Sequence, residues 1–393
     1  MSTNSRDRRS PSRRRRVAVV GVSLSDCGRV DEATSYALHA QAARRALADS
    51  GLDRSAVDGL ASAGLGTLAP VEVAEYLGLR PRWVDSTTVG GATWEVMAAH
   101  AADAIAAGRA NAVLLVYGST ARADIRAGRR TGNLSFGARG PLQFEVPYGH
   151  SLIAKYAMAA RRHMHEYGTT LEQLAEVAVQ ARAHAARNPE AMFRDPITVD
   201  DVLGGPMIAD PFTRLHCCIR SDGGCAVLLA AEEYVPGTAK APVWVLGTGE
   251  YVSHTTMSGW EDFTVSPASV SGRLAFERAG VRPEDIDLAE IYDAFTYMTL
   301  VTLEDLGFCA KGEGGAFFAD EDRLPVNTDG GGLSACHPGM RGLFLLVEAV
   351  RQLRGEAPGL QVRRPDGSLP ELAVASGTGG WFCSSGTVVL GRG

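Results

Sequence analysis

The apolar positions of this chain alternate between short β-branched runs and longer stretches with helical spacing. Residues 17–22 and 113–118 form two such runs, which predict buried strands. Residues 33–50 have helical spacing and stop at Gly51, a residue that suits a helix C-cap. The alanine-rich residues 98–107 predict another helix. Strands and helices that alternate in this way indicate an α/β fold with helices on both faces of the sheets.

The second half of the chain repeats the pattern of the first half. Residues 46–58 resemble residues 275–287, and Gly51 matches Gly280 at an offset of 229. A predicted strand precedes each copy, and a glycine-rich turn, a helix and a strand follow it. The spacing is too long for a small repeat and indicates a duplicated α/β unit. Two such halves around a shared core predict a five-layer α-β-α-β-α arrangement.

The repeat divides the chain into four parts. Residues 1–16 contain seven arginines and no apolar stretch, which predicts a disordered basic tail. Residues 17–120 and 236–393 form the two halves. Residues 121–235 form a loop or cap region that returns to the first sheet, and within it the arginine- and glycine-rich residues 122–139 predict a loop. Long insertions of this kind usually carry binding function.

Composition and charge narrow the classes of function. The formal net charge of -6 argues against a protein that holds nucleic acid. No apolar run approaches the roughly 20 residues needed to span a membrane. The seven cysteines have no paired spacing, which indicates reduced thiols in a cytoplasmic protein. Cys217 and Cys218 are adjacent to each other, unlike the ligands of a zinc site, so we expect no metal.

Three segments carry a resemblance to a known family. Residues 327–342 contain a glycine-rich turn followed by Cys-His-Pro, which resembles the Asn-x-x-Gly-Gly and Gly-His-Pro elements of the thiolase superfamily. Residues 213–224 and the Tyr-Asp-Ala-Phe of residues 292–295 resemble its sterol-carrier-protein-X branch, also called the lipid-transfer-protein thiolases. The resemblance covers nearly all of the chain after residue 16 and implies the thiolase fold with a loop-domain insertion.

Departures from the family pattern indicate different chemistry. Thiolases carry a reactive cysteine near a helix start, but residues 84–94 contain none, and glycine and alanine at residues 90–92 offer no substitute. The C-terminal loop at residues 376–381 lacks the second cysteine, and Tyr292 stands where the branch often has histidine. This set of losses resembles the thiolase-like steroid side-chain aldolases, which lack the nucleophilic cysteine.

That resemblance implies a lyase acting on a β-hydroxyacyl-CoA, with a steroid side chain as the expected acyl group. Such lyases work by retro-aldol cleavage and release a ketone and a short acyl-CoA such as propionyl-CoA. Coenzyme A would then be part of the substrate, with no covalently bound cofactor. The resemblance also implies a homodimer formed through a sheet edge, and a small partner protein with an OB-fold and a zinc-ribbon-like segment.

Retro-aldol cleavage needs a base for the hydroxyl proton and a donor for the enolate oxygen. Tyr292 is the first candidate for the base, although a phenol with an ordinary pKa of about 10 needs a neighbour to tune it. Asp293 and Tyr297 are the alternatives. His337 is the candidate donor to the thioester oxygen. A packed aromatic ring at Tyr292 and a structural carboxylate at Asp293 remain open as alternatives.

Backbone amides and a basic cluster complete the predicted site. The amides expected to help bind the thioester belong to glycines of the two glycine-rich turns: Gly330, Gly331, Gly332, Gly379 and Gly380. Arg122 and Arg126 belong to a basic cluster that could bind the phosphates of coenzyme A, and a solvated loop face is the alternative.

Two other functions remain open at this point. The chain could be an acyl-CoA C-acyltransferase or condensing enzyme of secondary metabolism that works with a small OB-fold partner. It could also be a non-catalytic thiolase-like subunit. A transferase predicts a covalent acyl adduct, whereas a non-catalytic subunit predicts no turnover and tolerance of changes at Tyr292 and His337.

Overall fold

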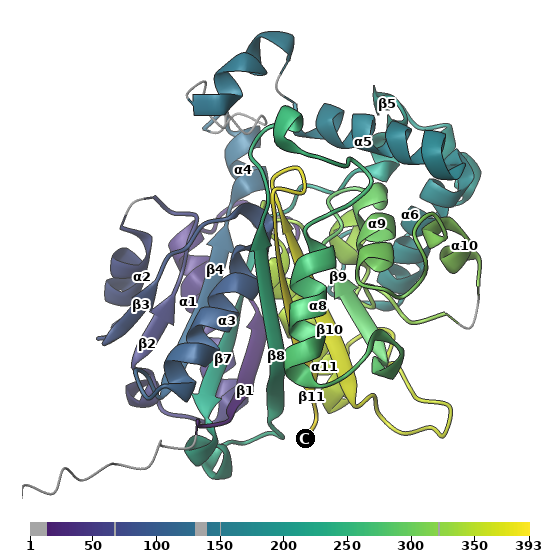
Figure 1. Cartoon of the computed structure of the whole chain (residues 1–393). Coiled ribbons are helices and arrows are strands. Elements are labelled where there is room, and N and C mark those ends of the chain that lie inside the picture. Colours follow the sequence, from purple (N-terminus) through teal and green to yellow (C-terminus); the bar gives the residue numbers. More distant parts are fainter. Residues whose placement is uncertain (1–13, 67, 130–139, 150, 321–322) are drawn as a thin grey trace, which may run out of the picture.

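The computed structural model describes residues 14–393, with gaps at residues 67, 130–139, 150 and 321–322. In the described part, nine strands form one mixed sheet in the order β3-β2-β4-β7-β1-β8-β11-β10-β9. The two halves of the chain meet at antiparallel β1 and β8, where Ala18 pairs with Trp244 and Val19 with Val243. Figure 1 shows the two sets of strands side by side, with helices on both sides.

The order of strands confirms the duplication. The first half supplies β1 (Val17–Leu24), β2 (Gly59–Ala61), β3 (Trp83–Asp85), β4 (Ala112–Ser119) and β7 (Gly223–Ala231). The second half supplies β8 (Val243–Val252), β9 (Leu288–Ile291), β10 (Leu372–Gly379) and β11 (Ser384–Gly391). The parallel pair β2 and β4 corresponds to the parallel pair β9 and β10, and β1 next to β7 corresponds to β8 next to β11.

Helices form an outer layer on each half and a layer between the halves. α1 (Ser35–Ser50) packs on β1, β4 and β7, and α8 (Ala268–Ala279) packs on β8 and β11. α3 (Thr93–Ala106) and α11 (Gly342–Arg354) each contact strands of both halves and one another, so they form the central layer. The predicted five-layer thiolase arrangement is therefore confirmed.

The same local signals place the outer helix in each half. α1 ends at Gly51 and α8 ends at Gly280, both in the left-handed conformation that favours glycine. Each helix also lies against a strand glycine. A Cβ atom on Gly21 would lie 2.3 Å from the carbonyl oxygen of Ala46, and one on Gly247 would lie 2.2 Å from that of Ala275. Glycine in the strand is what allows this close approach.

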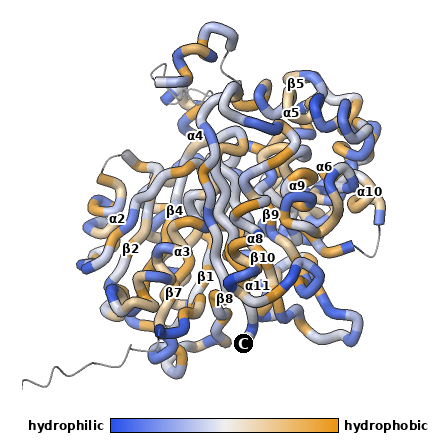
Figure 2. Tube along the Cα trace, viewed as in Figure 1, coloured by the Kyte–Doolittle hydropathy of each residue, from blue (hydrophilic) through white to orange (hydrophobic). Residues whose placement is uncertain are grey.

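The three largest clusters of apolar side chains among the described residues are a central core and two outer cores. The central core contains Trp94 and Met97 of α3, Leu343 of α11 and inward-facing strand residues such as Val227 and Val388. The outer cores lie under α1 and under α8. Figure 2 shows hydrophobic stretches running through the strands and central helices, with hydrophilic stretches towards peripheral elements such as α5.

The remaining helices and strands lie mostly in the insertion and around the second half. These are α2 (Ala69–Leu77), α4 (Ala121–Arg126), α5 (Leu152–Tyr167), α6 (Leu171–Arg187), α7 (Val199–Leu203), the hairpin of β5 (Met207–Ala209) and β6 (Phe212–Thr213), α9 (Thr296–Asp305) and α10 (Gly314–Ala319). The loop predicted at residues 122–139 is wrong at its start, because residues 121–126 are helical, and residues 130–139 lie outside the described part.

The basic tail needs a related correction. Residues 1–13 lie outside the described residues. Arg15 donates to the carbonyl oxygens of Ile105 and Ala110 at 2.7 and 2.6 Å, and Arg16 stacks over the ring of Trp244 at 3.7 Å. The end of the predicted tail is therefore bound to the folded part. The domain limits at residues 120 and 235 stay a prediction. None of the helices in the described residues combines the length and the apolar character needed to cross a membrane.

Candidate active site

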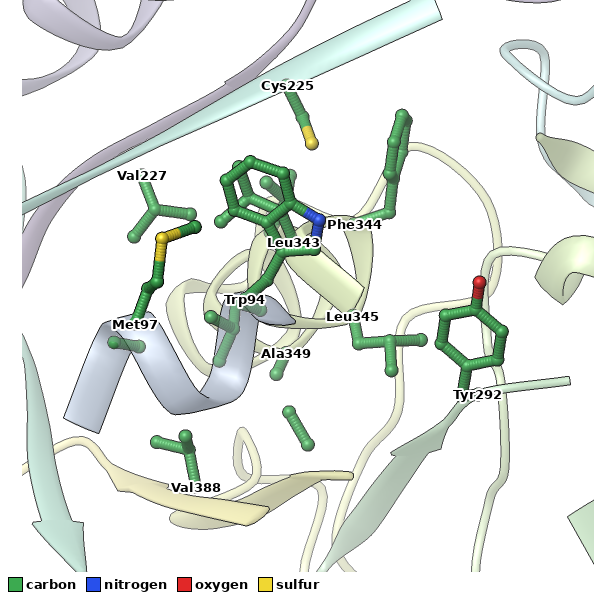
Figure 3. Close-up of a cluster of buried hydrophobic side chains, with 14 of the residues drawn as sticks. Trp94, Met97, Cys225, Val227, Tyr292, Leu343, Phe344, Leu345, Ala349 and Val388 are labelled. Carbon is green, nitrogen blue, oxygen red and sulfur yellow. The ribbon is translucent and has the colours of Figure 1, made fainter. Parts of the chain in front are cut away.

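Three segments from different parts of the fold meet at the C-terminal end of β9. Tyr292 directly follows β9, His337 lies in the loop before α11, and Gly90–Ala92 forms a short turn before α3. The rings of Tyr292 and His337 meet edge to face, with centroids 5.5 Å apart and planes at 87°. Figure 3 shows the Tyr292 ring projecting from the end of β9 at the edge of the central core. The structure therefore brings two predicted site residues together.

The ring of Tyr292 fills the space next to Gly91. A Cβ atom on Gly91 would lie 2.5 Å from two ring carbons of Tyr292 and 2.3 Å from the carbonyl oxygen of Thr378. Such distances are sterically forbidden, so only glycine fits at residue 91 while Tyr292 keeps this position. The segment where thiolases carry their nucleophile is thus closed by tyrosine, and it is not an open space.

The glycines of the second turn touch the same segment. Gly90 has a φ of 80°, and a Cβ atom on it would lie 2.8 Å from the Cα atom of Gly379 and the backbone nitrogen of Gly380. Gly379 and Gly380 therefore lie directly against the turn before α3. Their place is consistent with the predicted role near the thioester, which stays a prediction.

His337 is buried and has one ring nitrogen without a partner. Its backbone N–H donates to the hydroxyl oxygen of Ser221 at 2.8 Å, which fixes the loop. Its Nε2 atom has no hydrogen-bond partner among the described residues. Burial, with the nearby charge of Arg341, lowers the pKa of His337 to about 4. The imidazole is therefore neutral at physiological pH, with one donor and one acceptor nitrogen.

A buried ion cluster holds the histidine loop, and sequence reasoning missed its centre. Arg341 is fully buried and donates to both carboxylate oxygens of Asp329 at 2.6 and 2.7 Å. Its guanidinium also lies 3.4 Å from Asp293 and donates to the carbonyl oxygen of Cys336 at 2.9 Å. Arg341 therefore fixes the backbone next to His337. The sequence shows that Arg341 lies four residues after His337, but it does not show that Arg341 is buried.

Asp293 holds the glycine-rich turn. Its carboxylate accepts from the N–H groups of Gly332 and Leu333 at 2.7 and 3.1 Å. Burial raises the pKa of Asp293 to about 6, against the opposing charge of Arg341. A carboxylate occupied by two amides and a guanidinium has little capacity left for substrate. The structural alternative for Asp293 is therefore the better supported one.

The structure does not support the prediction that the amides of Gly330, Gly331 and Gly332 bind the thioester. Their N–H groups already donate within the protein at 3.0, 2.8 and 2.7 Å, to oxygen atoms of Asn327, Asp329 and Asp293. The turn is therefore a structural element that supports the histidine loop.

Comparisons with known proteins agree with this geometry. Residues 249–392 match the family model described as thiolase C-terminal domain-like. The chain is 33% identical over 378 residues to 17-hydroxy-3-oxo-4-pregnene-20-carboxyl-CoA lyase of Mycobacterium tuberculosis, covering 92% of this chain and 96% of that protein. It is also 33% identical over 380 residues to the steroid side-chain-cleaving aldolase of Thermomonospora curvata, covering 92% and 95%.

A solved structure gives the same result. The structure described as Ltp2-ChsH2(DUF35) aldolase superposes with a TM-score of 0.84 at 30% identity, covering 96% of this chain and 97% of that one. The chain belongs to the thiolase superfamily, in its group of thiolase-like aldolases. The predicted family and fold are thus confirmed.

In the described residues, the cysteines near the site do not have the features of an activated nucleophile. Burial raises the pKa of Cys217 to about 12 and that of Cys383 to about 11. Cys336 precedes His337, but its thiol forms a hydrogen bond with the hydroxyl group of Ser221 at 3.2 Å. Among the described residues, no group of three histidine, cysteine or acidic side chains could hold a metal ion.

The remaining predicted residues are occupied elsewhere. Tyr297 is fully buried on α9 and donates to the carbonyl oxygen of Phe263 at 3.0 Å, so the alternative of Tyr297 as a base is not supported. Arg122 is bound to Asp31 and Asp222 at 2.6 and 3.2 Å and is not free for a phosphate. Arg126 is mostly exposed and lies 3.9 Å from Asp31, so it stays a candidate for coenzyme A.

Proposed function

We propose that this protein is a carbon–carbon lyase that cleaves a β-hydroxyacyl-CoA by retro-aldol chemistry. The observation that carries the proposal is the packing of Tyr292 beside Gly91, opposite the unpartnered Nε2 of His337. This arrangement closes the position of a covalent nucleophile and leaves two neutral proton-exchanging groups side by side. Retro-aldol cleavage needs such groups and no acyl-enzyme.

The pKa directions favour an assignment of roles that differs from the sequence-based one. Burial raises the pKa of Tyr292 well above its ordinary value, which opposes a phenolate base and favours a phenol that donates. The neutral imidazole of His337 can accept a proton. We therefore assign His337 as the base and Tyr292 as the donor to the thioester oxygen, and both roles are proposals.

The proposed step balances without another reactant. Nε2 of His337 takes the proton of the β-hydroxyl group, the hydroxyl oxygen forms the ketone, and the bond between the α and β carbons breaks. Its electron pair moves into a thioester enolate, whose oxygen accepts a hydrogen bond from Tyr292. The imidazolium of His337 then returns the proton to the α carbon, which gives the shortened acyl-CoA.

The names of the relatives support a substrate and a partner. The Mycobacterium tuberculosis protein is named for a steroid CoA ester with a hydroxyl group. We propose a substrate of that class, with a tertiary hydroxyl on the β carbon and propionyl-CoA as the short product. The matching solved structure is described with a DUF35 protein. We propose a similar OB-fold partner here, and a homodimer through β3, whose edge residue Val84 is half exposed.

The test uses the purified protein together with a DUF35-type partner. A steroid CoA ester with a tertiary β-hydroxyl is supplied, and mass spectrometry follows the ketone and propionyl-CoA. Both products should appear in equal amounts, and the protein mass should not change. A covalent acyl adduct would favour the acyltransferase alternative. Absence of both products with the partner bound would contradict the proposed function.

A further inference from the structure

Glu95 is a buried acid that the proposed chemistry does not use. It lies in the first turn of α3, three residues after the turn that contacts Tyr292. Its side chain is 1% exposed, and neither carboxyl oxygen has a hydrogen-bond partner among the described residues. Burying an unpartnered polar group costs free energy, and burying an unpaired carboxylate costs much more. A buried ionisable group without partners, at the edge of a candidate active site, is a candidate for a functional residue.

Three glycines from the second half form the seat of this carboxyl group. A Cβ atom on Gly377 would lie 2.0 Å from Oε2 of Glu95, and one on Gly342 would lie 2.5 Å from the same oxygen. A Cβ atom on Gly386 would lie 2.8 Å from the Cβ atom of Glu95. Any side chain at these positions would displace the acid. The two halves of the fold thus enclose Glu95 between the central layer and β10 and β11.

The seat lies next to Tyr292. The point where a Cβ atom on Gly342 would lie is 2.6 Å from the carbonyl oxygen of Gly91, as well as 2.5 Å from Oε2 of Glu95. Gly91 in turn touches the ring of Tyr292. One backbone residue therefore separates the buried carboxyl group from the proposed donor.

In the described part of the chain, no cationic side chain forms a hydrogen bond to Glu95. The titratable groups packed around this turn are Tyr292, Cys225 of β7 and Tyr117 of β4, all of which become negative on ionisation. Two cations at α11 act on Cys225 as well. The guanidinium of Arg341 is held by Asp293 and Asp329, and that of Arg351 is held by Glu190. His100, further along α3, pairs with Asp85 and Glu250 at the exposed side of the helix.

We propose that Glu95 is a positioning residue of the Tyr292 site and acts as a neutral carboxylic acid that must keep its proton during turnover. This inference rests on the proposed function. A thioester enolate develops negative charge where Tyr292 donates, and a carboxylate separated from Tyr292 by one buried backbone residue would repel that charge. A protonated Glu95 fills the glycine seat without that repulsion. Burial raises the pKa of Glu95 to about 8, so the neutral form is present at neutral pH.

The first test compares kcat/KM at pH 7 and pH 9 in the complete complex with its partner. The wild type should lose about tenfold in kcat/KM between the two values, as one ionisation near pH 8 requires. Glu95→Gln has nearly the same shape and no proton to lose, so its ratio between the two pH values should stay close to one. If Glu95 had a purely structural role, Glu95→Gln would show the same decline in kcat/KM between pH 7 and pH 9 as the wild type.

Glu348→Gln is the matched control. Glu348 is also a buried glutamate of the central layer, and burial raises its pKa to about 7. Its carboxylate accepts hydrogen bonds from Thr328 and Gln352 at 2.7 and 2.8 Å, so it is held by polar partners and not by glycines. Glu348→Gln should keep the alkaline decline of the wild type. If Glu95→Gln also keeps that decline, or is folded but inactive at both pH values, the proposal is overturned.

A second measurement does not depend on turnover. Infrared difference spectra of wild type and Glu95→Gln should show a protonated-carboxyl band in the wild type at pH 7 that is lost as the pH rises through about 8. Absence of this band at pH 7 would overturn the proposal even if the enzyme is active. If the band is present but no steroid CoA ester is cleaved, the proposed function fails and the neutral state of Glu95 stands.

Discussion

The two central helices begin after junctions that occupy the same place in the duplicated halves but differ in chemistry. The junction before α3 ends in Gly90, Gly91 and Ala92, which carry no polar side chain, and Gly91 contacts Tyr292. The junction before α11 carries His337 and Arg341 within a buried ion cluster. The comparison shows that duplication repeated the architecture, whereas the proposed reactive groups lie in the second half alone.

The two junctions are also held in place by different forces. Close backbone contact holds the first one: Gly90 and Gly91 leave no room for a Cβ atom, and Ser384 donates to the carbonyl oxygen of Val89 at 2.6 Å. Ion pairing holds the second one through Arg341. We therefore expect steric changes to disturb the first junction and charge changes to disturb the second.

The largest effect is expected where the two junctions meet at Tyr292. Tyr292→Phe keeps the ring that fills the space beside Gly91 but removes the proposed donor to the enolate oxygen. We expect kcat to fall by about 10²–10⁴-fold, the usual range for a lost proton-transfer or donor group. Steady-state assays of ketone release measure this. Tyr297→Phe is the control, because its hydroxyl bonds to Phe263 away from the site; equal losses in both variants would contradict the assignment.

A change of charge at the second junction should come next. Arg341→Met leaves Asp293 and Asp329 buried without their cation, and breaking a buried pair costs about 3–5 kcal/mol. Denaturant unfolding measures the loss. Arg351→Met is the control, because its pair with Glu190 is partly exposed and such pairs contribute about 1 kcal/mol or less. If the two variants lose equal stability, the ion cluster does not hold the junction.

A steric change at the first junction should have a smaller effect. Gly91→Ala forces a Cβ atom against Tyr292 and the carbonyl oxygen of Thr378, and overpacking of this kind costs about 1–3 kcal/mol. Thermal unfolding reports the stability, and the assay reports the displacement of Tyr292. Gly237→Ala is the control, because the nearest atom to its added Cβ would lie at 4.0 Å. Normal turnover in Gly91→Ala would show that the tyrosine can move without loss.

The smallest effect should come from the ion pair at the start of the first junction. His100 donates to Asp85 at 2.7 Å, and this hydrogen bond raises the pKa of His100. A raised histidine pKa stabilises the fold fully below the ordinary pKa, and this stability is lost as the pH rises through the folded value. His100→Asn should therefore lose less than about 1 kcal/mol at pH 6, because the pair is partly exposed. Unfolding at pH 6 and pH 9 tests this: the loss should be absent at pH 9.

Much of the fold was predictable because its signals are local. The offset between Gly51 and Gly280 gave the duplication, and both residues cap helices in the structure. The pairing of Tyr292 with His337 followed from the family motifs. The structural role of Gly330, Gly331 and Gly332 could not be predicted from the sequence. Their amides donate either to a distant residue, as Gly332 does to Asp293, or within the turn itself, as Gly331 does to Asp329.

The sequence by itself determined the α/β elements, the two related halves and the absence of a cysteine from residues 84–94. These features depend on spacing and residue type, which are written along the chain. Only the tertiary structure decided that Glu95 and Arg341 are buried, that Tyr292 fills the space beside Gly91, and that burial shifts their ionisation. The physical reason is that desolvation depends on which distant segments pack around a group, and here those segments come from the opposite half of the fold.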